Sequence, residues 1–314
     1  MVITIVVVYV DDIILTGDVA SIQGLKSRLH KTFSIKDLGI LHYFLGIEVT
    51  YTPTGIILTQ KKFIKDLLDF SGISDHKRVV TPLPLNLKLT ANEGLLYPNP
   101  TYYRNLGGKL DFLTHTRSDL AYTVQHLNQF MKSPRMPHYE ALQYSLKYIT
   151  STASQVILLH ATYQLTLQAF SDSDWASCPN SERSFIGYIL LFGKSPICWK
   201  SKKQPTVFKS SSEAEYRVMA FASSEITWTV RLLEELVFHE RTKHIEVDCH
   251  FTRDKVLEGL IQLSYLPTQF QLADVLTKTL PSNQLTLIQA WHGPVLDFQV
   301  FPLNECIHSS CEYL

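Results

Sequence analysis

A chain of 314 residues has room for two domains, since domains usually run to about 100–200 residues. Its composition is 45% hydrophobic and 18% charged, which is typical of a globular protein and excludes a disordered chain. The 29 basic and 29 acidic side chains give no formal net charge, which disfavours a protein that binds nucleic acid by charge alone.

Cysteine usage and hydropathy bear on the cellular compartment. The five cysteines are scattered and no Cys-x-x-Cys pair occurs, so neither a zinc module nor a disulfide framework is expected. The apolar run at residues 2–10 is far shorter than the ~20 residues that span a bilayer, and no basic segment precedes it as in a secretory signal. We therefore expect an intracellular protein with no signal peptide, no transmembrane segment and no membrane partner.

Two adjacent carboxylates, Asp11 and Asp12, separate the apolar residues 2–10 from the apolar residues 13–15. The β-branched residues on both sides predict a strand, a tight turn and a second strand. If the pair is buried, two charges ~5 Å apart repel by roughly 3 kcal/mol at an effective dielectric of ~20, which a cation would offset. An ordinary hairpin turn is the alternative, because Asp tolerates turn geometry, and the spacing leaves both open.

A helix, a strand pair and a second helix are predicted next. Asp18 is a suitable cap for a helix with an apolar stripe at Ile22, Leu25, Leu29 and Phe33. Residues 41–60 predict two strands that turn at residues 52–55, and a helix follows around residues 63–70.

The following part of the chain is predicted to be helical. Two prolines in four residues mark residues 81–89 as a linker. Residues 102–150 predict three helical pieces, broken near Ser118 and at Pro134 and Pro137, with no strand among them.

A second unit opens near residue 165 with the alternating stretch "LTLQAFSDSDW", which predicts a strand with Asp172 and Asp174 on one face. Residues 185–192 and 196–199 predict two more strands. A long helix comes next, with apolar residues at three- and four-residue steps: Met219, Ala222, Ile226, Val230, Leu233 and Val237.

Acidic residues of this second unit form a candidate metal site. Glu215 lies one helical turn before the apolar stripe, Asp172 lies near a strand end, and Asp274 occurs in "LADVLTK". Carboxylate oxygens of this kind suit Mg²⁺ or Mn²⁺. The structural alternative is that Ser212-x-x-Glu215 is a capping box and that the Asp residues are turn or solvated residues.

A short basic cluster offers a local patch for nucleic acid despite the neutral chain. It comprises Lys200, Lys202, Lys203 and Lys209. The alternative is a solvated loop.

Taken together, several stretches resemble the pol polyprotein of copia-type retrotransposons, over about residues 2–285. "YVDDIILTGD" is similar to the reverse transcriptase hairpin, and "LGILHYFLGIEV" to the strand pair that supports the primer end. "YYRNLGGKLDFLTHTRSDLAYTVQHLNQFM" resembles the thumb helices, with Ser118 where the family usually has Pro. "FSDSDWASCPNSERSFIGY", "CWKSKKQPTVFKSSSEAEYRVMA", "RTKHIEVDCHFTRDKV" and "LADVLTKTLP" resemble blocks of the ribonuclease H domain.

The resemblance implies RNA-directed DNA polymerase and ribonuclease H chemistry, both with Mg²⁺ or Mn²⁺. It assigns Asp11 and Asp12 to the polymerase metals, with Asp11 as the direct ligand. It assigns Asp172, Asp274 and Glu215 to the ribonuclease metals, and Glu215 fits better than Glu213 because it lies on the buried stripe.

The implied partners are an RNA–DNA hybrid or a primer–template, and the family life cycle implies a cytoplasmic location. The expected contacts with nucleic acid are Gly46, Lys109, Lys200, Lys202 and Lys203.

The implied fold is α+β: partial palm hairpins and thumb-like helices, followed by a truncated ribonuclease H-like α/β domain with a mixed sheet. The boundaries are residues 1–90 for the palm part, 91–160 for the helical thumb or connection region, and 161–285 for the ribonuclease H-like domain. Residues 286–314 have no assigned role.

Two departures from the family indicate lost function. A third palm Asp lies well upstream of the hairpin in the family, whereas only ten residues precede Asp11 here. An internal deletion near residues 236–240 removes the strand that ends in an Asp-Asn pair, and Asp248 or Glu246 would have to replace its carboxylate. His244 and His250 belong to the family's block but are expected to be ordinary polar residues.

The sequence therefore predicts a fragment of a retrotransposon reverse transcriptase and ribonuclease H that is catalytically defective. The missing N-terminal polymerase part would then have to come from another chain. The alternatives are a non-enzymatic module that binds nucleic acid or protein, and a decayed transposon relic.

Overall fold

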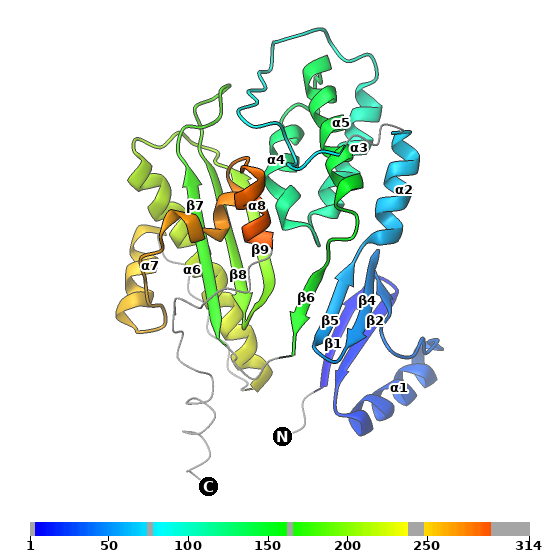
Figure 1. Ribbon diagram of the computed structural model, residues 1–314. Coiled ribbons are helices and arrows are strands. Elements are labelled where there is room, and N and C mark those ends of the chain that lie inside the picture. The colour runs from blue at the N-terminus through cyan, green and yellow to red at the C-terminus, as the bar shows by residue number, and fades with distance from the viewer. Residues whose placement is uncertain (1–3, 74–77, 162–165, 238–247, 290–314) are drawn as a thin grey trace.

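A computed structural model describes residues 4–73, 78–161, 166–237 and 248–289, which form an α+β protein (Figure 1). The described strands lie in three antiparallel sheets, with the orders β1-β2, β3-β4-β5-β6 and β7-β8-β9. The α+β class expected from the sequence is confirmed. Among the described residues, no helix combines the length and the apolarity needed to cross a membrane.

The first hairpin consists of β1 (Thr4–Tyr9) and β2 (Asp12–Gly17). Its two-residue turn is Val10 and Asp11, and Val10 has a positive φ of 50°, which strains a β-branched residue. Asp11 and Asp12 are exposed, as are Val8 at 63% and Val10 at 80%. Of the two alternatives that the sequence leaves open, the exposure of Asp11 and Asp12 supports the ordinary hairpin turn.

The helix after the hairpin, α1 (Val19–Phe33), begins as predicted. The Asp18 carboxylate accepts a hydrogen bond from the Ser21 backbone N–H at 3.0 Å, which caps the helix. None of its residues is buried, and Phe33 at the end of the predicted apolar stripe is 70% exposed. Ile22, Leu25 and Leu29 are half-buried and α1 contacts β2, so the stripe is only partly covered within the described residues.

The second sheet consists of β3 (Tyr43–Phe44), β4 (Ile47–Thr52), β5 (Gly55–Thr59) and β6 (Ile157–His160). The predicted strand pair with its turn at residues 52–55 is confirmed, because Thr52 pairs with Gly55. The predicted helix around residues 63–70 is confirmed as α2 (Lys61–Ser71). β6 returns from the helical region to pair with β5.

The helical region is also confirmed. It consists of α3 (Pro100–Leu113), the 3₁₀ turn η1 (Ser118–Leu120), α4 (Ala121–Asn128) and α5 (Met136–Ser151). Pro137 lies in the first turn of α5, where a proline costs no hydrogen bond, while Pro134 lies between α4 and α5.

The predicted linker at residues 81–89 has no helix or strand, as expected, but it is not a free connection. Leu83 and Leu89 are each only 2% exposed and belong to the main hydrophobic core. The Ser145 hydroxyl of α5 donates a hydrogen bond to the Pro82 carbonyl at 2.9 Å. The prolines predict the irregular backbone, but they do not reveal this burial.

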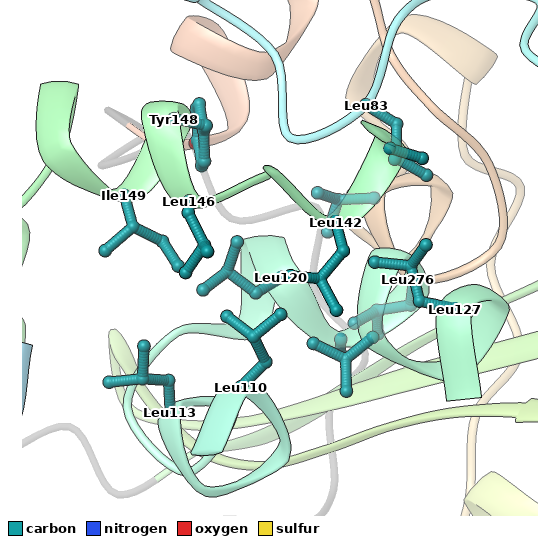
Figure 2. Close-up of a cluster of buried hydrophobic side chains, with 14 of the residues drawn as sticks. Leu83, Leu110, Leu113, Leu120, Leu127, Leu142, Leu146, Tyr148, Ile149 and Leu276 are labelled. Atoms are coloured by element: carbon teal, nitrogen blue, oxygen red, sulfur yellow. The ribbon is translucent and has the colours of Figure 1, made fainter. Parts of the chain in front are cut away.

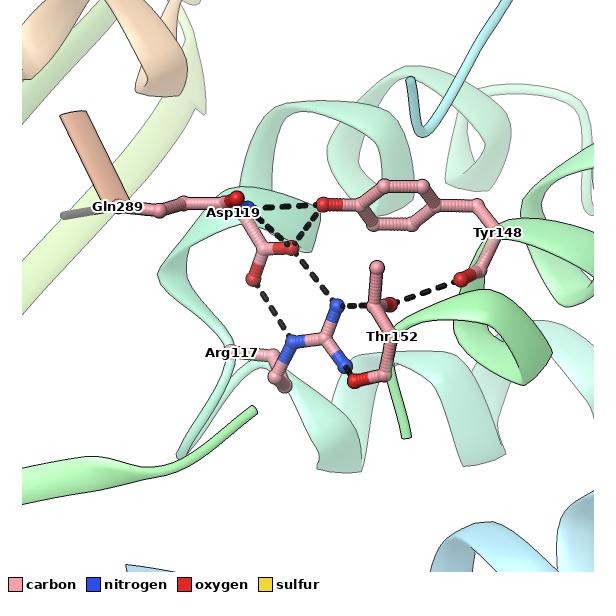
Figure 3. A network of polar contacts seen from close by, with 5 residues as sticks. All are labelled: Arg117, Asp119, Tyr148, Thr152 and Gln289. Atoms are coloured by element: carbon pink, nitrogen blue, oxygen red, sulfur yellow. Dashed lines mark hydrogen bonds and ion pairs between the residues drawn. The ribbon is translucent and has the colours of Figure 1, made fainter. Parts of the chain in front are cut away.

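A buried ion pair holds the junction between α3 and α4 (Figure 3). The Arg117 guanidinium donates to both carboxylate oxygens of Asp119, at 2.9 and 2.8 Å, and both side chains are almost fully buried. The Tyr148 hydroxyl donates to Asp119 at 2.7 Å, and Arg117 also donates to the Thr152 hydroxyl at 2.8 Å. The Gln289 amide donates to the Tyr148 hydroxyl at 2.9 Å, which ties the last described helix to α5.

The third sheet consists of β7 (Leu167–Asp174), β8 (Phe185–Phe192) and β9 (Ser195–Lys203). The remaining elements are α6 (Ser211–Val237), α7 (Asp248–Leu257), α8 (Ser282–Gln289) and the 3₁₀ turns η2 (Thr268–Phe270) and η3 (Leu272–Leu276). The three predicted strands and the long helix are thus confirmed, although β9 is longer than expected. Figure 1 shows α6 across one face of the sheet and α8 over the other.

One hydrophobic core joins the helical region to the third sheet. It contains Leu110, Leu127 and Leu142 of the helices together with Phe170 of β7 and Leu276 of η3 (Figure 2). The Trp199 indole N–H of β9 donates to the Thr114 carbonyl at 2.8 Å across the same contact. A smaller cluster packs the other face of the sheet against α6, with these residues: Leu167, Tyr188, Leu190, Ala222, Ile226 and Val230.

The first turn of α6 differs from the predicted capping box. The Ser210 hydroxyl accepts from the Glu213 N–H at 3.2 Å, and the Glu213 carboxylate accepts from the Lys209 N–H at 3.0 Å. The box therefore lies two residues earlier than Ser212-x-x-Glu215. This difference leaves the Glu215 side chain available for other contacts.

Candidate functional site

The structure brings three of the predicted acidic residues together at one end of β7. Asp172 lies on β7, Glu215 in the second turn of α6 and Asp274 in η3. The Thr277 hydroxyl donates a hydrogen bond to the Asp172 carboxylate, which connects the chain after η3 to the strand. The Glu215 carboxylate accepts from the Ser173 backbone N–H at 3.2 Å, at the edge of the sheet.

A glycine makes the close approach of η3 possible. Gly187 of β8 lies directly opposite Asp172, and a Cβ at this position would collide with the Leu276 side chain. Any larger residue would push η3, and Asp274 with it, away from the sheet.

Lys278 forms ion pairs with two of these carboxylates. Its ammonium lies 2.9 Å from an Asp274 oxygen and 3.6 Å from an Asp172 oxygen. Burial lowers the pKa of Lys278, but the charges of Asp172 and Asp274 outweigh burial and raise it, so the side chain stays protonated.

The environment also favours protonation of the carboxyl groups. Burial, followed by the charge of Asp172, raises the pKa of Glu215 to about 7. Burial is likewise the largest cause of the raised pKa values of Asp274 and Asp174. At neutral pH the cluster therefore carries less negative charge than its three carboxyl groups would in water.

Oxygen donors of this kind suit Mg²⁺ or Mn²⁺, but the observed arrangement does not present them as a ready metal site. Within the described ranges, no group of three His, Cys, Asp or Glu side chains lies close enough to hold a metal ion. The Lys278 ammonium supplies the positive charge between Asp172 and Asp274 instead.

The two carboxylates of the first hairpin do not belong to this cluster of Asp172, Glu215 and Asp274. Asp11 and Asp12 lie at the exposed tip of the first hairpin, and the described residues bring no metal-binding group of carboxylates to it. Among the other predicted residues, Glu246 and His244 lie outside the described residues. Asp248 and His250 fall in the first turn of α7, where the structure does not describe their side chains.

Only two of the predicted nucleic-acid contacts are exposed lysines. Lys200 and Lys202 point to the same side of the edge strand β9 and are exposed. Lys203 points to the other face, where its ammonium donates to the Gln129 side chain at 2.7 Å. Lys109 lies over the rings of Phe63 and Phe70, at 5.6 and 5.0 Å from their centroids.

Gly46 has a structural explanation. It has a φ of 80° in the tight turn between β3 and β4, and a Cβ would lie 2.7 Å from the Phe112 ring. Glycine is thus required for the turn and for the contact with α3.

Sequence reasoning missed Lys278 and the Arg117–Asp119 pair. Lys278 follows Asp274 by four residues, a spacing that favours an ion pair on one side of a helical turn. No local pattern distinguishes Arg117 and Asp119 from solvated residues of a helix break. Their burial comes from α5 and Gln289, which lie far away in the sequence.

The comparisons with known proteins identify the family. A model of the reverse transcriptase (RNA-dependent DNA polymerase) family matches residues 2–84. The Pol polyprotein of transposon RE1 from Arabidopsis thaliana is 41% identical over 298 residues, covering 87% of this chain and 20% of the relative. That of transposon TNT 1-94 from Nicotiana tabacum is 30% identical over 322 residues, covering 92% of this chain and 24% of the relative.

A shorter relative is matched over nearly its whole length. An uncharacterised mitochondrial protein of Arabidopsis thaliana is 40% identical over 222 residues, which cover 70% of this chain and 92% of that protein. No solved structure matches the chain. The chain spans about a fifth of the RE1 polyprotein, and it belongs to the family of copia-type retrotransposon Pol polyproteins, with a reverse transcriptase region at residues 2–84.

Proposed function

We propose that the chain combines three parts of a Pol protein. They are the C-terminal part of a reverse transcriptase palm (residues 1–90), a helical thumb or connection region (91–160) and a ribonuclease H-like domain (161–285). The observation that carries this proposal is the convergence of Asp172, Glu215 and Asp274 from three elements far apart in the sequence. Such a cluster is what a metal-dependent hydrolase of nucleic acid needs.

We further propose that the cluster does not catalyse hydrolysis of an RNA–DNA hybrid as it stands. Lys278 occupies the position between the carboxylates of Asp172 and Asp274. A divalent cation would have to displace the ammonium before it could bind both Asp172 and Asp274. The polymerase site is proposed to be inactive too, because Asp11 and Asp12 have no third carboxylate beside them in the described residues.

The wild-type chain is expected to leave a labelled RNA–DNA hybrid uncleaved in either Mg²⁺ or Mn²⁺. The measurement is a gel assay with the Asp172→Asn variant purified in parallel. Cleavage by the wild type that disappears in Asp172→Asn would contradict the proposed loss of activity and would assign hydrolysis to this cluster.

A matched pair of variants tests the reason given for the loss. Lys278→Gln leaves the buried Asp274 and the partly buried Asp172 without their cation, so Mn²⁺ should bind about tenfold more tightly in titration calorimetry, a change of about 1.4 kcal/mol. Lys255→Gln removes the α7 lysine that pairs with Glu258, the residue after this helix, and should leave Mn²⁺ binding unchanged. Equal Mn²⁺ affinity in both variants would exclude Lys278 as the competing cation.

A second candidate function is binding to a hybrid or primer–template without catalysis. It rests on the exposed Lys200 and Lys202, which lie side by side on β9. If they contact phosphates, Lys200→Glu/Lys202→Glu should weaken filter binding to a hybrid and reduce the slope of log K against log salt by about 2. Lys61→Glu/Lys65→Glu on α2 is the control with the same charge change, and equal losses in both variants would exclude a specific β9 patch.

A further inference from the structure

A cavity of about 270 Å³ lies between β7, α6 and the segment 261–266. Its walls are largely apolar and include Leu167, Met219, Ile226 and Ile261. An apolar cavity of about 150 Å³ can hold a benzene molecule, so this one has room for roughly ten carbon atoms. The size and the lining therefore suit a small apolar ligand.

Two polar side chains of the wall, those of Gln271 and Ser223, have partners within the protein. The Gln271 amide N–H donates to the Ser171 carbonyl at 3.0 Å, and the Gln271 oxygen accepts from the Ala273 N–H at 3.2 Å. The Ser223 hydroxyl donates to the Thr252 hydroxyl at 3.2 Å. Both side chains are thus fixed parts of the wall.

Glu215 lies at the end of the cavity near the start of α6, one helical turn before Met219. Of the described residues that line the cavity, it is the only one with a charged side chain. Its carboxylate accepts from the Ser173 N–H at 3.2 Å. Because a carboxylate can accept about four hydrogen bonds, Glu215 retains the capacity to bind a ligand.

The charged groups around Glu215 favour a cation over an anion. Asp172 and Asp274 belong to the same cluster, and the Lys278 ammonium forms ion pairs with both of them. Three carboxyl groups and one ammonium thus meet at this end of the cavity. The ligand chemistry that fits is an apolar chain that ends in a positively charged hydrogen-bond donor.

We propose that this cavity is a binding site for a small alkyl amine, whose chain packs between Leu167, Met219 and Ile226 and whose ammonium binds the Glu215 carboxylate. A neutral or anionic molecule with the same chain would occupy the apolar space but would form no ion pair with Glu215. The proposal rests on the shape and charge of the cavity and does not depend on hydrolysis at the carboxylate cluster.

Titration calorimetry with octylamine tests the charge, using the full-length chain in metal-free buffer at pH 8. The wild type should bind one octylamine about tenfold more tightly than 1-octanol or octanoate, which have the same chain length. Glu215→Gln keeps the size of the side chain and an oxygen for the Ser173 N–H, but it removes the charge. It should bind octylamine about tenfold more weakly than the wild type, with unchanged affinity for 1-octanol.

A matched pair of tryptophan variants on α6 tests the space. Met219→Trp fills part of the cavity and should weaken the binding of both octylamine and 1-octanol. Phe221→Trp, on the exposed face of the same helix, should bind both as the wild type does. Circular dichroism shows whether Met219→Trp folds, and Glu215→Gln alone decides the question if it does not.

Four results would overturn the proposal. They are the absence of octylamine binding to the wild type, octanoate binding as tight as that of octylamine, wild-type octylamine affinity in Glu215→Gln or in folded Met219→Trp, and equal losses in the two tryptophan variants.

Discussion

Replacing Asp119 with asparagine is expected to lower the free energy of unfolding by about 3–5 kcal/mol, because it leaves the buried Arg117 guanidinium without its counter-charge. Asp119 is 8% exposed and Arg117 only 2%, so water cannot compensate for the lost charge. Burial alone would raise the pKa of Asp119, but Arg117 outweighs it and holds that pKa below its usual value. The stabilisation is therefore present above the unfolded-state pKa near 3.8 and is lost as the pH falls below it.

Urea unfolding at neutral pH is the measurement, and two variants calibrate it. Thr152→Val removes one hydrogen bond to Arg117 without removing a charge, and should cost only about 1 kcal/mol. Arg117→Met/Asp119→Leu removes both charges and should recover much of the loss. A cost for Asp119→Asn no larger than that for Thr152→Val would show that the ion pair does not hold this junction.

Acidification from pH 7.5 to 4.5 is expected to destabilise the wild type more than a His126→Phe variant. His126 is 5% exposed, and burial, followed by the charges of Lys203 and His138, lowers its pKa from 6.5 to about 4. Between these values the unfolded chain binds a proton that the folded protein does not, so stability falls as the pH falls. Lowering the pKa of His126 from 6.5 to about 4 corresponds to a loss of about 3 kcal/mol of folding stability once the titration is complete.

The effect of His126 is read from the difference in unfolding free energy between the wild type and His126→Phe, because Glu215 changes the stability in the opposite direction as the pH falls. Its pKa of about 7 exceeds the unfolded value of 4.5, so its protonation stabilises the fold as the pH drops through this range. Subtracting the His126→Phe curve from the wild-type curve cancels that contribution. The exposed His115→Phe serves as the control, and a wild-type curve parallel to His126→Phe would exclude His126 as the titrating group.

Local sequence patterns predicted most of the individual elements. The turn between β4 and β5, the Asp18 cap of α1 and the length of α6 follow from turn residues and periodicity, which act over a few residues. Burial was predicted less well. The apolar β1 and β2 are exposed, whereas the proline-containing residues 81–89 are packed in the core, because burial depends on elements far away in the chain.

The candidate site shows the same limit. The apolar stripe of α6 correctly places Glu215 on the inner face of the helix. The sequence contains two overlapping Ser-x-x-Glu spacings, however, and the helix is capped by Ser210 and Glu213 rather than by Ser212 and Glu215. The lysines of β9 differ in exposure because neighbouring strand residues point to opposite faces of the sheet. Lys202 is exposed, whereas Lys203 contacts Gln129. The partnership of Lys278 with Asp172 spans more than a hundred residues and has no local signature.

The hydrophobic core shared by the helical region and the third sheet has a consequence for cooperativity. Phe170 and Leu276 of the third-sheet region pack in the same cluster as Leu110 and Leu142 of the helical region. The two regions therefore share one hydrophobic core. Cutting the chain near residue 160 would expose this interface on both pieces, and each piece would lose part of the core that it shares with the other. We therefore expect the two parts to unfold together in a single transition.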